Sequence, residues 1–415
     1  MRVVVCTVVH HPADARILHR QIRALLDAGH QVTYIAPLGA GPVAAWPGLT
    51  LAEVPRAVGR RRLSALRAAR RQLARYAPGA DVLLIHDPEL LLVLPLVRRR
   101  PPTVWDVHED TAAALGTKAW LPAALRRVVA AAVLRAERTA ERHLHLILAE
   151  TGYNARFRGT HPVVPNTTYV PDQPAPYDGR SRVVYVGHIS PDRGAAELAE
   201  LARLVTPHGV AVELVGSADA AARAVLEPAV AAGLLRWHGY LPNDEAMIIT
   251  GGALAGLSLL QDDPNFRHSM PTKVAEYMAR GVPVITTPLP LAVDLVERHE
   301  CGYVVPFAPA TAPAAAEAVL ALQRDPALRD AMGERGHQGA SQYLRWPEDA
   351  RAFVAQLEQW AGGAQGVRGS GDIRGPEGVQ GSGGAQGPRG AGAPGAAAAA
   401  PPTPPSSPVS AQDGR

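Results

Sequence analysis

The first 36 residues place one amphipathic segment between two short apolar runs, and this order limits the fold more than any other feature. Residues 2–9 and 31–36 are rich in β-branched and other apolar side chains, which is typical of buried strands. Residues 15–28 carry apolar side chains at helical spacing, and Gly29 ends this predicted helix. A strand–helix–strand unit of this kind requires parallel strands joined by a right-handed crossover. The chain therefore begins as an α/β protein.

The turn after the first strand lacks the glycine pattern of dinucleotide-binding domains. It reads HHPADAR over residues 10–16. An NAD-binding Rossmann domain holds its diphosphate with a G-x-G-x-x-G turn at this position. The sequence therefore argues against an NAD-type domain.

Strands and helices continue to alternate along most of the chain, with one break. Residues 171–182 are polar and proline-rich, which predicts an interdomain linker. The alternation then restarts, so we expect two doubly wound α/β domains, at residues 1–170 and 183–345. The predicted strands are 2–9, 31–36, 81–85, 103–107, 146–149, 162–164, 183–186, 212–215, 235–240, 257–260 and 282–286. The predicted helices are 15–28, 63–76, 89–99, 121–143, 193–205, 219–232, 271–280, 311–322 and 326–343.

The C-terminal part divides into a helix and a tail. Residues 346–361 have an amphipathic pattern, and the predicted helix either lengthens the second domain or returns to the first. Residues 362–415 consist mainly of Gly, Pro, Ala, Ser and Gln, with almost no large apolar side chains. Such a segment cannot offset the entropy lost on ordering, so we expect a disordered tail.

The positive charge of the chain is mostly arginine and is clustered. The net charge is +4, and many arginines lie within residues 56–75. Few aromatic residues interleave with them, which argues against a nucleic-acid groove. Two interpretations remain: a solvated helix surface, or a surface for an anionic membrane or an acidic acceptor.

Cysteine usage and apolar runs indicate the compartment. Cys6 and Cys301 are far apart and lie in apolar surroundings, which points to a reducing environment rather than a disulfide framework or a metal site. The run at residues 2–9 has no cleavage-site pattern, and residues 247–260 are too short to span a bilayer. We expect a cytoplasmic protein, with peripheral contact to the inner face of the plasma membrane as a further hypothesis.

Residues 265–288 combine a helix start with two charged residues. A helix is predicted from Pro271 onward, with Ser269 as a candidate cap. Its free N–H groups and Lys273 suit an anion, and Glu276 lies one turn deeper on the same face. This arrangement suggests a nucleotide, with its diphosphate at the helix end and its ribose at Glu276. The alternative is that Glu276 only pairs with a neighbouring arginine on the helix.

The turn GHISPDRG at residues 187–194 occupies a corresponding place after the first strand of the second domain. Gly187 allows close backbone approach, and Arg193 begins a predicted helix and can bind two phosphate oxygens. With Lys273 it would neutralise a departing diphosphate without a metal, and the chain contains no D-x-D spacing. The alternative reading of Arg193 is a surface helix start.

Three predicted strands of the first domain end in histidine and carboxylate side chains. Ligands of open α/β sheets bind outside the carboxyl ends of strands. The residues concerned are His10, His11 and Asp14; His86 and Asp87; and His108, Glu109 and Asp110.

Six stretches, in their order and spacing, resemble the GT-B glycosyltransferases of family four over residues 1–360. They read HPADARILHRQIRALLDAGHQVTYIAP, IHDPELL, VWDVHED, VPNTTY, YVGHISPDRGAAEL and SMPTKVAEYMARGVPVITTPLP. The resemblance implies two Rossmann-like domains facing across a cleft. It also implies a nucleoside-diphosphate-sugar co-substrate in the C-terminal domain, and transfer to an acceptor hydroxyl with retention of configuration. It further implies that the helix at residues 346–361 crosses back to the first domain. From the residues themselves we expect no metal and no further cofactor.

The resemblance also implies roles for individual residues. Glu276 would hold the ribose, and Arg193 and Lys273 would contact the diphosphate. A histidine at the position of His108 would lie near the reacting carbon, where it orients the acceptor hydroxyl or stabilises charge; the alternative is a structural hydrogen bond to Asp106 or Asp110. The complete donor-side set is Gly187, His188, Arg193, His268, Ser269, Met270, Pro271, Thr272, Lys273 and Glu276. The weaker acceptor-side set is His11, Asp14, Arg16, His86, Asp87 and Glu109.

Two residues depart from the family pattern. His188 stands where the family commonly has arginine, and His268 stands where a sugar-contacting glutamate is expected, eight positions before Glu276. The strand–turn–helix frame is kept, while the sugar contact is changed.

Three functions fit the sequence. The first is glycosyl transfer, in cell-surface glycan or glycoconjugate synthesis, to a glycan, lipid-linked or small-molecule acceptor. The second is a UDP-sugar 2-epimerase of related fold. The third is a non-catalytic nucleotide-sugar-binding protein. The sequence leaves the base, the sugar and the acceptor open.

Overall fold

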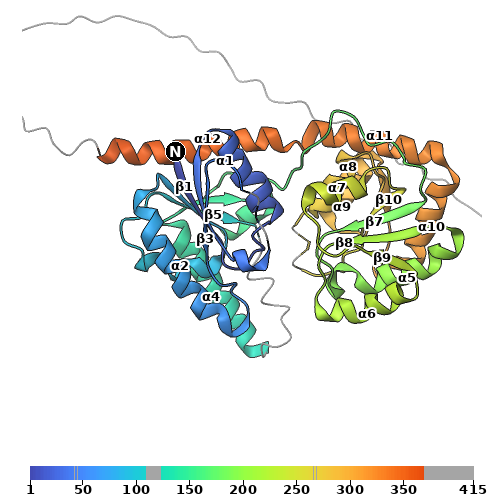
Figure 1. Cartoon of the computed structure of the whole chain (residues 1–415), viewed down its shortest axis with the longest axis horizontal. Coiled ribbons are helices and arrows are strands. Elements are labelled where there is room, and N and C mark those ends of the chain that lie inside the picture. Colours follow the sequence, from blue (N-terminus) through green and yellow to red (C-terminus); the bar gives the residue numbers. More distant parts are fainter. Residues whose placement is uncertain (42, 44, 109–122, 265, 268, 369–415) are drawn as a thin grey trace, which may run out of the picture. The chain divides into compact units, whose positions relative to one another are not determined.

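The computed structural model describes residues 1–41, 43, 45–108, 123–264, 266–267 and 269–368. Two six-stranded sheets, in which every described strand pairs in parallel with its neighbours, form two lobes, each flanked by helices (Figure 1). In the part of the chain that the structure describes, no helix is both long and apolar enough to cross a membrane.

The sheet of the first lobe has the strand order β3-β2-β1-β4-β5-β6. Its order reverses between β1 and β4, which is the switch point where α/β sheets bind ligands. The strands are β1 (Arg2–Cys6), β2 (Gln31–Ala36), β3 (Leu49–Glu53), β4 (Val82–Ile85), β5 (Thr103–Val107) and β6 (His145–Leu148).

Helices cover both faces of this sheet. A π-type helix (Ala15–Ile22) continues into α1 (Arg23–Asp27) and packs on one face, while α2 (Arg62–Tyr76) and α4 (Ala123–Glu141) lie on the other. The last helix, α12 (Trp346–Arg368), also packs here, because its Trp346, Phe353 and Leu357 are buried in the same cluster as β1. The C-terminal helix therefore completes the core of the N-terminal lobe.

The second lobe repeats the plan, with the strand order β12-β11-β10-β7-β8-β9. Its strands are β7 (Arg182–Val186), β8 (Ala211–Val215), β9 (Leu235–Trp237), β10 (Ala255–Ser258), β11 (Val284–Thr286) and β12 (Gly302–Val304). Its helices are α5 (Ala195–Val205), α6 (Ala220–Ala231), α7 (Asn243–Thr250), α8 (Thr272–Ala279), α9 (Pro290–His299), α10 (Thr311–Arg324) and α11 (Pro326–Tyr343).

The helices of the second lobe also divide between two faces. One apolar cluster joins the sheet to α5, α6 and α10, and another joins it to α7, α8 and α9. Because α8 is packed so tightly, seven of its eight residues are buried, including Lys273 and Glu276. Two charged side chains are therefore held at fixed places beside the end of the sheet.

Several predicted elements differ in the structure. The predicted helix 89–99 is two short 3₁₀ turns, Pro88–Leu92 and Leu94–Leu96, because each carries a proline that lacks a donor for a helical ladder. The predicted strand 162–164 is reduced to one isolated bridge, Leu148 to Val163. The short elements β3, β12, α7 and α9 were not predicted.

The ends of two predicted elements also move. β1 ends at Cys6, three residues before the predicted end of the first strand. The last helix continues to Arg368, seven residues past its predicted end, and the rest of the predicted tail lies outside the described residues.

Candidate functional site

A cavity of about 640 Å³ lies where strand ends and helix starts of both lobes converge. From the first lobe, the predicted residues that line it are His11, Asp14, Arg16 and His108. From the second lobe, they are Gly187, His188, Arg193, Ser269, Met270, Pro271, Thr272, Lys273 and Glu276. His86 and Asp87 are buried behind this lining. Glu109 and His268 lie outside the described residues.

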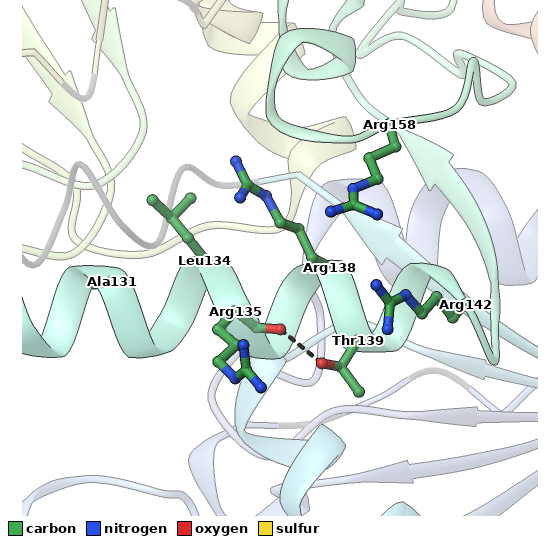
Figure 2. Close-up of a pocket in the computed structure, with 7 residues that line it drawn as sticks. All are labelled: Ala131, Leu134, Arg135, Arg138, Thr139, Arg142 and Arg158. Carbon is green, nitrogen blue, oxygen red and sulfur yellow. Dashed lines mark hydrogen bonds between the residues drawn. The ribbon is translucent and has the colours of Figure 1, made fainter.

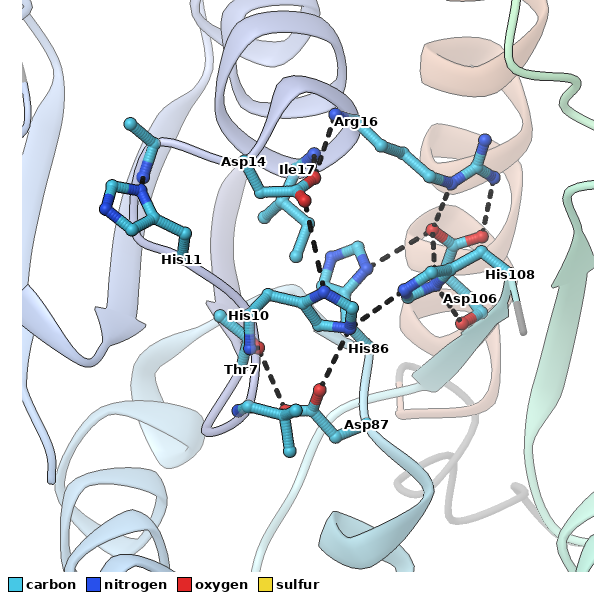
Figure 3. A network of polar contacts seen from close by, with 12 residues as sticks. Thr7, His10, His11, Asp14, Arg16, Ile17, His86, Asp87, Asp106 and His108 are labelled. Atoms are coloured by element: carbon cyan, nitrogen blue, oxygen red, sulfur yellow. Dashed lines mark hydrogen bonds and ion pairs between the residues drawn. The ribbon is translucent and has the colours of Figure 1, made fainter. Parts of the chain in front are cut away.

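Asp106, at the end of β5, is the centre of the polar contacts on the first-lobe side (Figure 3). Its two carboxylate oxygens accept the Nε and Nη2 hydrogens of Arg16, each at 2.7 Å. Gln21 Nε2 donates to the same carboxylate at 2.9 Å, and His86 Nδ1 lies 3.2 Å away. Burial alone would raise the pKa of Asp106, but Arg16, and to a smaller extent His86 and His108, hold it well below its usual range.

Asp14 caps the π-type helix that carries Arg16. Its side chain accepts the backbone N–H groups of Arg16 and Ile17 at 2.9 and 3.0 Å. The cap fixes the start of the helix, and the helix then aims the Arg16 guanidinium at Asp106. Arg16 Nη1 also donates to Asn166 at 2.9 Å. Asp14 and Arg16 therefore build the wall of the cavity rather than face it as free groups.

Asp87, at the end of β4, is held by the loop after β1. Thr7 Oγ1 and the backbone N–H of Val8 donate to its Oδ2. Its other oxygen, Oδ1, lies 3.2 Å from Nε2 of His10. Asp87 is thus fixed in place with one oxygen directed at a histidine of the cavity wall.

His108 is bonded on both sides of its ring. Its Nδ1 lies 3.1 Å from the backbone carbonyl oxygen of Asp106, and its Nε2 lies 2.9 Å from Nε2 of His10 (Figure 3). The structural hydrogen bond to Asp106, which the sequence left as an alternative role for His108, is therefore present. His108 nevertheless also lines the cavity.

His86, Asp106 and His108 are the one group of described residues whose arrangement could hold a metal ion, with ligand atoms within 4.8 Å of one another. The donor set does not fit one, because both oxygens of Asp106 already accept from Arg16 and the guanidinium charge would repel a cation. We therefore interpret the cluster as a hydrogen-bonded network.

Gly187 and Gly216 allow the turn after β7 to approach the turn after β8 closely. Gly216 has φ +143°, and a Cβ at this position would lie 1.9 Å from the carbonyl oxygen of Gly187. Gly187 itself has φ +119°, and Lys273 Nζ lies 3.9 Å from where its Cβ would be. The turn is therefore free of side chains where it meets Lys273.

Lys273 carries a buried amine without a hydrogen-bond partner among the described residues. Its Nζ lies 3.7 Å above the ring of Tyr185. Burial, and then the nearby charge of Arg193, lower the pKa of Lys273 well below its ordinary value. A positive charge in this position is stabilised by any anion that binds beside Gly187.

Arg193 and His188 flank the same turn. Arg193 belongs to a 3₁₀ turn, Pro191–Arg193, and α5 starts only after Gly194, so the prediction that Arg193 begins the helix was wrong. Its guanidinium lies 5.7 Å from the ring centre of Phe266. His188 Nδ1 lies 3.1 Å from Ser217 Oγ; burial and Arg193 lower the pKa of His188.

Glu276 faces two donors that the sequence did not reveal. Its Oε1 lies 3.3 Å from Arg20 Nη2 and 3.1 Å from Asn243 Nδ2. Arg280, the neighbour expected four residues on, donates instead to the backbone oxygen of Glu276. Arg20 lies four residues after Arg16, so the helical spacing of the two arginines was the signal that could have found it.

The start of α8 also differs from the prediction. Pro271 occupies the N-cap, one residue before the helix, and no side chain caps the helix. Ser269 lines the cavity without that role. The prediction of Pro271 at the first helical position with a Ser269 cap was therefore wrong by one residue.

Glu150 reaches the same loop from the end of β6. Its carboxylate accepts the backbone N–H of Met270 at 3.0 Å. Burial raises the pKa of Glu150 to about 7, against smaller opposing effects of that hydrogen bond and of Arg16. No pattern in the sequence singled out this residue.

A second hollow, of about 270 Å³, lies on α4 and is lined by arginines (Figure 2). Its lining is Ala131, Leu134, Arg135, Arg138, Thr139, Arg142 and Arg158. Glu137 of the same helix pairs with Arg156, and Glu141 accepts the backbone N–H groups of Arg158 and Gly159. Among the described residues no carboxylate pairs with these four lining guanidinium groups, so the hollow is strongly positive.

Three solved structures match this chain over most of both lengths. Sucrose-phosphate synthase from Thermosynechococcus elongatus has a TM-score of 0.67 and 18% identity, covering 87% of this chain and 99% of its own. WaaG, a glycosyltransferase involved in lipopolysaccharide biosynthesis, has 0.63 and 15%, covering 85% and 98%. Anabaena HepE in complex with UDP-glucose has 0.63 and 14%, covering 86% and 100%. The predicted fold class, GT-B with two Rossmann-like lobes, is confirmed.

The family follows from the sequence of the second lobe. Residues 180–325 match the glycosyl transferases group 1. The second lobe, with the turn at Gly187 and the helix at Lys273, therefore matches this family, and the resemblance predicted from the sequence is confirmed. No curated protein sequence matches the chain.

Replacing Glu150 by glutamine should make stability less dependent on pH. The raised pKa contributes stability below the ordinary value of 4.5, and this contribution is lost as pH rises to about 7. As the pH rises from 5 to 8, we therefore expect the thermal midpoint of the native protein to fall relative to that of Glu150→Gln. At pH 8 the variant should have the higher midpoint. Glu317→Gln, at an exposed site on α10, is the control. Parallel pH profiles for Glu150→Gln and the native protein would contradict the assignment.

Proposed function

We propose that the protein is a glycosyltransferase that moves a hexosyl group from a nucleoside-diphosphate sugar to an acceptor hydroxyl, with retention of configuration and without a metal. The observation that carries the proposal is the buried amine of Lys273, which has no hydrogen-bond partner among the described residues and lies beside Gly187. Together with Arg193 in the same cavity wall, it forms a positive site that suits a diphosphate.

The sugar nucleotide would bind by supplying partners to the charged groups of the cavity wall. A diphosphate beside Gly187 restores the solvation that Lys273 lost on burial, and Arg193 adds a second cation. Glu276, one turn deeper, accepts the ribose hydroxyls, and it already faces the donors Arg20 and Asn243. The two cations stabilise the charge that develops on the leaving diphosphate, which is electrostatic catalysis.

His108 is proposed to act at the acceptor side of the reacting carbon. It lines the cavity from the end of β5, in the first lobe, while the proposed diphosphate site belongs to the second. A neutral imidazole can accept a hydrogen bond from a hydroxyl and orient it. The acceptor-side residues His11, Asp14 and Arg16 would shape the neighbouring surface.

The solved structures support a sugar nucleotide of this kind. HepE is seen with UDP-glucose, and WaaG acts in lipopolysaccharide biosynthesis. We therefore propose cell-surface glycan or glycoconjugate synthesis as the pathway class, with UDP-sugars as the first donors to test.

Two alternatives predict different products. A UDP-sugar 2-epimerase converts its nucleotide sugar without any acceptor, and a non-catalytic binding protein holds the nucleotide without turnover. The deciding experiment is a thermal-shift screen with UDP-, GDP-, ADP- and dTDP-sugars, followed by product analysis with and without acceptors, in EDTA. Acceptor-dependent glycoside in EDTA supports the proposal; epimerised donor, or binding alone across all acceptors, overturns it.

We also propose that the arginine hollow on α4 contacts an anionic membrane or a lipid-linked acceptor from the cytoplasmic side. Its four guanidinium groups, which pair with no carboxylate of the described residues, favour a surface of negative charge. The arginines of α2 add to this, since the helix buries Ala65, Ala69 and Leu73 and leaves its arginines exposed.

Glu276→Ala should weaken nucleotide binding severely. Loss of the ribose contact removes one or two charge-assisted hydrogen bonds, which weakens the binding free energy by about 2–4 kcal/mol. The Kd should then rise on the order of 100-fold. Calorimetry with the nucleotide diphosphate measures it. Glu297→Ala, on α9, is a matched control that lies outside the cavity. A variant that binds as well as the native protein would show the ribose assignment to be wrong.

His108→Ala should lower transfer while donor affinity hardly changes. The side chain is proposed to act on the acceptor hydroxyl, and such positioned groups contribute on the order of 100-fold to rate. Initial rates give kcat, and calorimetry gives the donor Kd of the same variant. Unchanged turnover would remove His108 from the reaction.

Charge reversal of Arg138, Arg142 and Arg158 together should release the protein from anionic vesicles. Each arginine near such a surface contributes about 1 kcal/mol, so the partition coefficient should fall on the order of 100-fold or more. Co-sedimentation with phosphatidylcholine vesicles, with and without phosphatidylglycerol, measures it. The control reverses Arg203, Arg298 and Arg324 on the second lobe. Equal losses in both triple variants, or no binding by the native protein, would refute the hollow as a membrane contact.

A further inference from the structure

His10 and His108 meet through the same atom of each ring. Their Nε2 atoms are 2.9 Å apart, and the ring centres are 4.7 Å apart (Figure 3). His10 comes from the loop after β1 and His108 from the end of β5, so the contact joins two strand ends of one sheet. Both rings line the cavity.

The hydrogen-bond partners determine where the protons lie. Nδ1 of His108 is 3.1 Å from the backbone carbonyl oxygen of Asp106, which can only accept, so Nδ1 carries a hydrogen. In the neutral ring the lone pair of His108 is then on Nε2. Two lone pairs would repel each other at 2.9 Å, so the hydrogen between the rings belongs to Nε2 of His10.

The carboxylates around His10 attract that hydrogen. Asp87 Oδ1 lies 3.2 Å from Nε2 of His10, and Asp14 Oδ2 lies 3.9 Å from its Nδ1. Asp87 cannot turn away, because Thr7 and the backbone N–H of Val8 hold its other oxygen. Among the described residues, His108 and Asp87 are thus acceptors within reach of the Nε2 hydrogen of His10.

We propose that His10 is a positioning residue that donates to Nε2 of His108 until a substrate hydroxyl takes its place. This inference rests on the proposed role of His108 in transfer. A sugar or acceptor hydroxyl reaches the lone pair of His108 only by replacing His10 as its donor. His10 then turns its hydrogen to Asp87, so no buried group loses its partner.

The exchange has a consequence for how His108 works. Its ring orientation is fixed before substrate arrives, from one side by the Asp106 carbonyl and from the other by His10. The incoming hydroxyl therefore finds a lone pair already aimed at the cavity, and less ordering is needed at the moment of binding.

The first test needs no activity. In protein labelled with ¹⁵N-histidine, the two Nε2 atoms should show scalar coupling across the hydrogen bond, and His108 should carry its hydrogen on Nδ1. His10→Gln and His108→Gln assign the two signals, and His143→Gln, at an exposed position, is the control. Absence of the coupling together with a hydrogen on Nε2 of His108 would overturn the proposal.

The second test separates the hydrogen bond that His10 donates from the space that its ring fills. The amide of His10→Gln can still donate to His108, whereas His10→Phe keeps a ring and loses the donor. We expect kcat of the phenylalanine variant to fall about tenfold, with the donor KM unchanged, and the glutamine variant to recover most of it. Equal rates in native, glutamine and phenylalanine forms would overturn the positioning role. If the coupling is present and native protein transfers no sugar, the proposed function fails while the hydrogen bond stands.

Discussion

The buried ion pair between Arg16 and Asp106 is the contact on which the first-lobe side of the cavity depends. Both side chains are almost fully buried, so neither charge would be tolerated alone. The pair joins the helix after β1 to the end of β5, and it fixes the carbonyl of Asp106 that holds His108. Removing one partner would leave a buried charge, and the position of His108 would change with it.

The opposite side of the cavity depends on charge left without a protein partner. Lys273 is buried, its amine has no hydrogen-bond partner in the part of the chain that the structure describes, and Gly187 beside it carries no side chain. On the first-lobe side the buried carboxylate of Asp106 is paired with Arg16; on the second-lobe side the amine of Lys273 is the group for which we propose an anion from outside. Such a division suits a protein in which one lobe holds an anionic donor and the other positions a reacting hydroxyl.

Local patterns predicted most of the fold. Lys273 and Glu276 could be proposed as donor-side residues because a helix start and its spacing are local in sequence. Arg20 and Asn243, which face Glu276, come from 256 and 33 residues away, and no spacing rule connects them. The short strands β3 and β12 form by pairing with β2 and β11, which a sequence does not reveal. The contacts of Arg16 and Gln21 with Asp106 also join distant parts of the sequence, so they were not predicted.

The last helix gives the chain an unusual order of assembly. Trp346, Phe353 and Leu357 of α12 complete an apolar cluster that otherwise belongs to the first 164 residues. During synthesis the first lobe is made early, yet its core stays unfinished until the second lobe and α12 have followed. Nascent first lobes therefore expose apolar surface for the time it takes to translate the remainder, and a chain that stops short of α12 leaves that surface open.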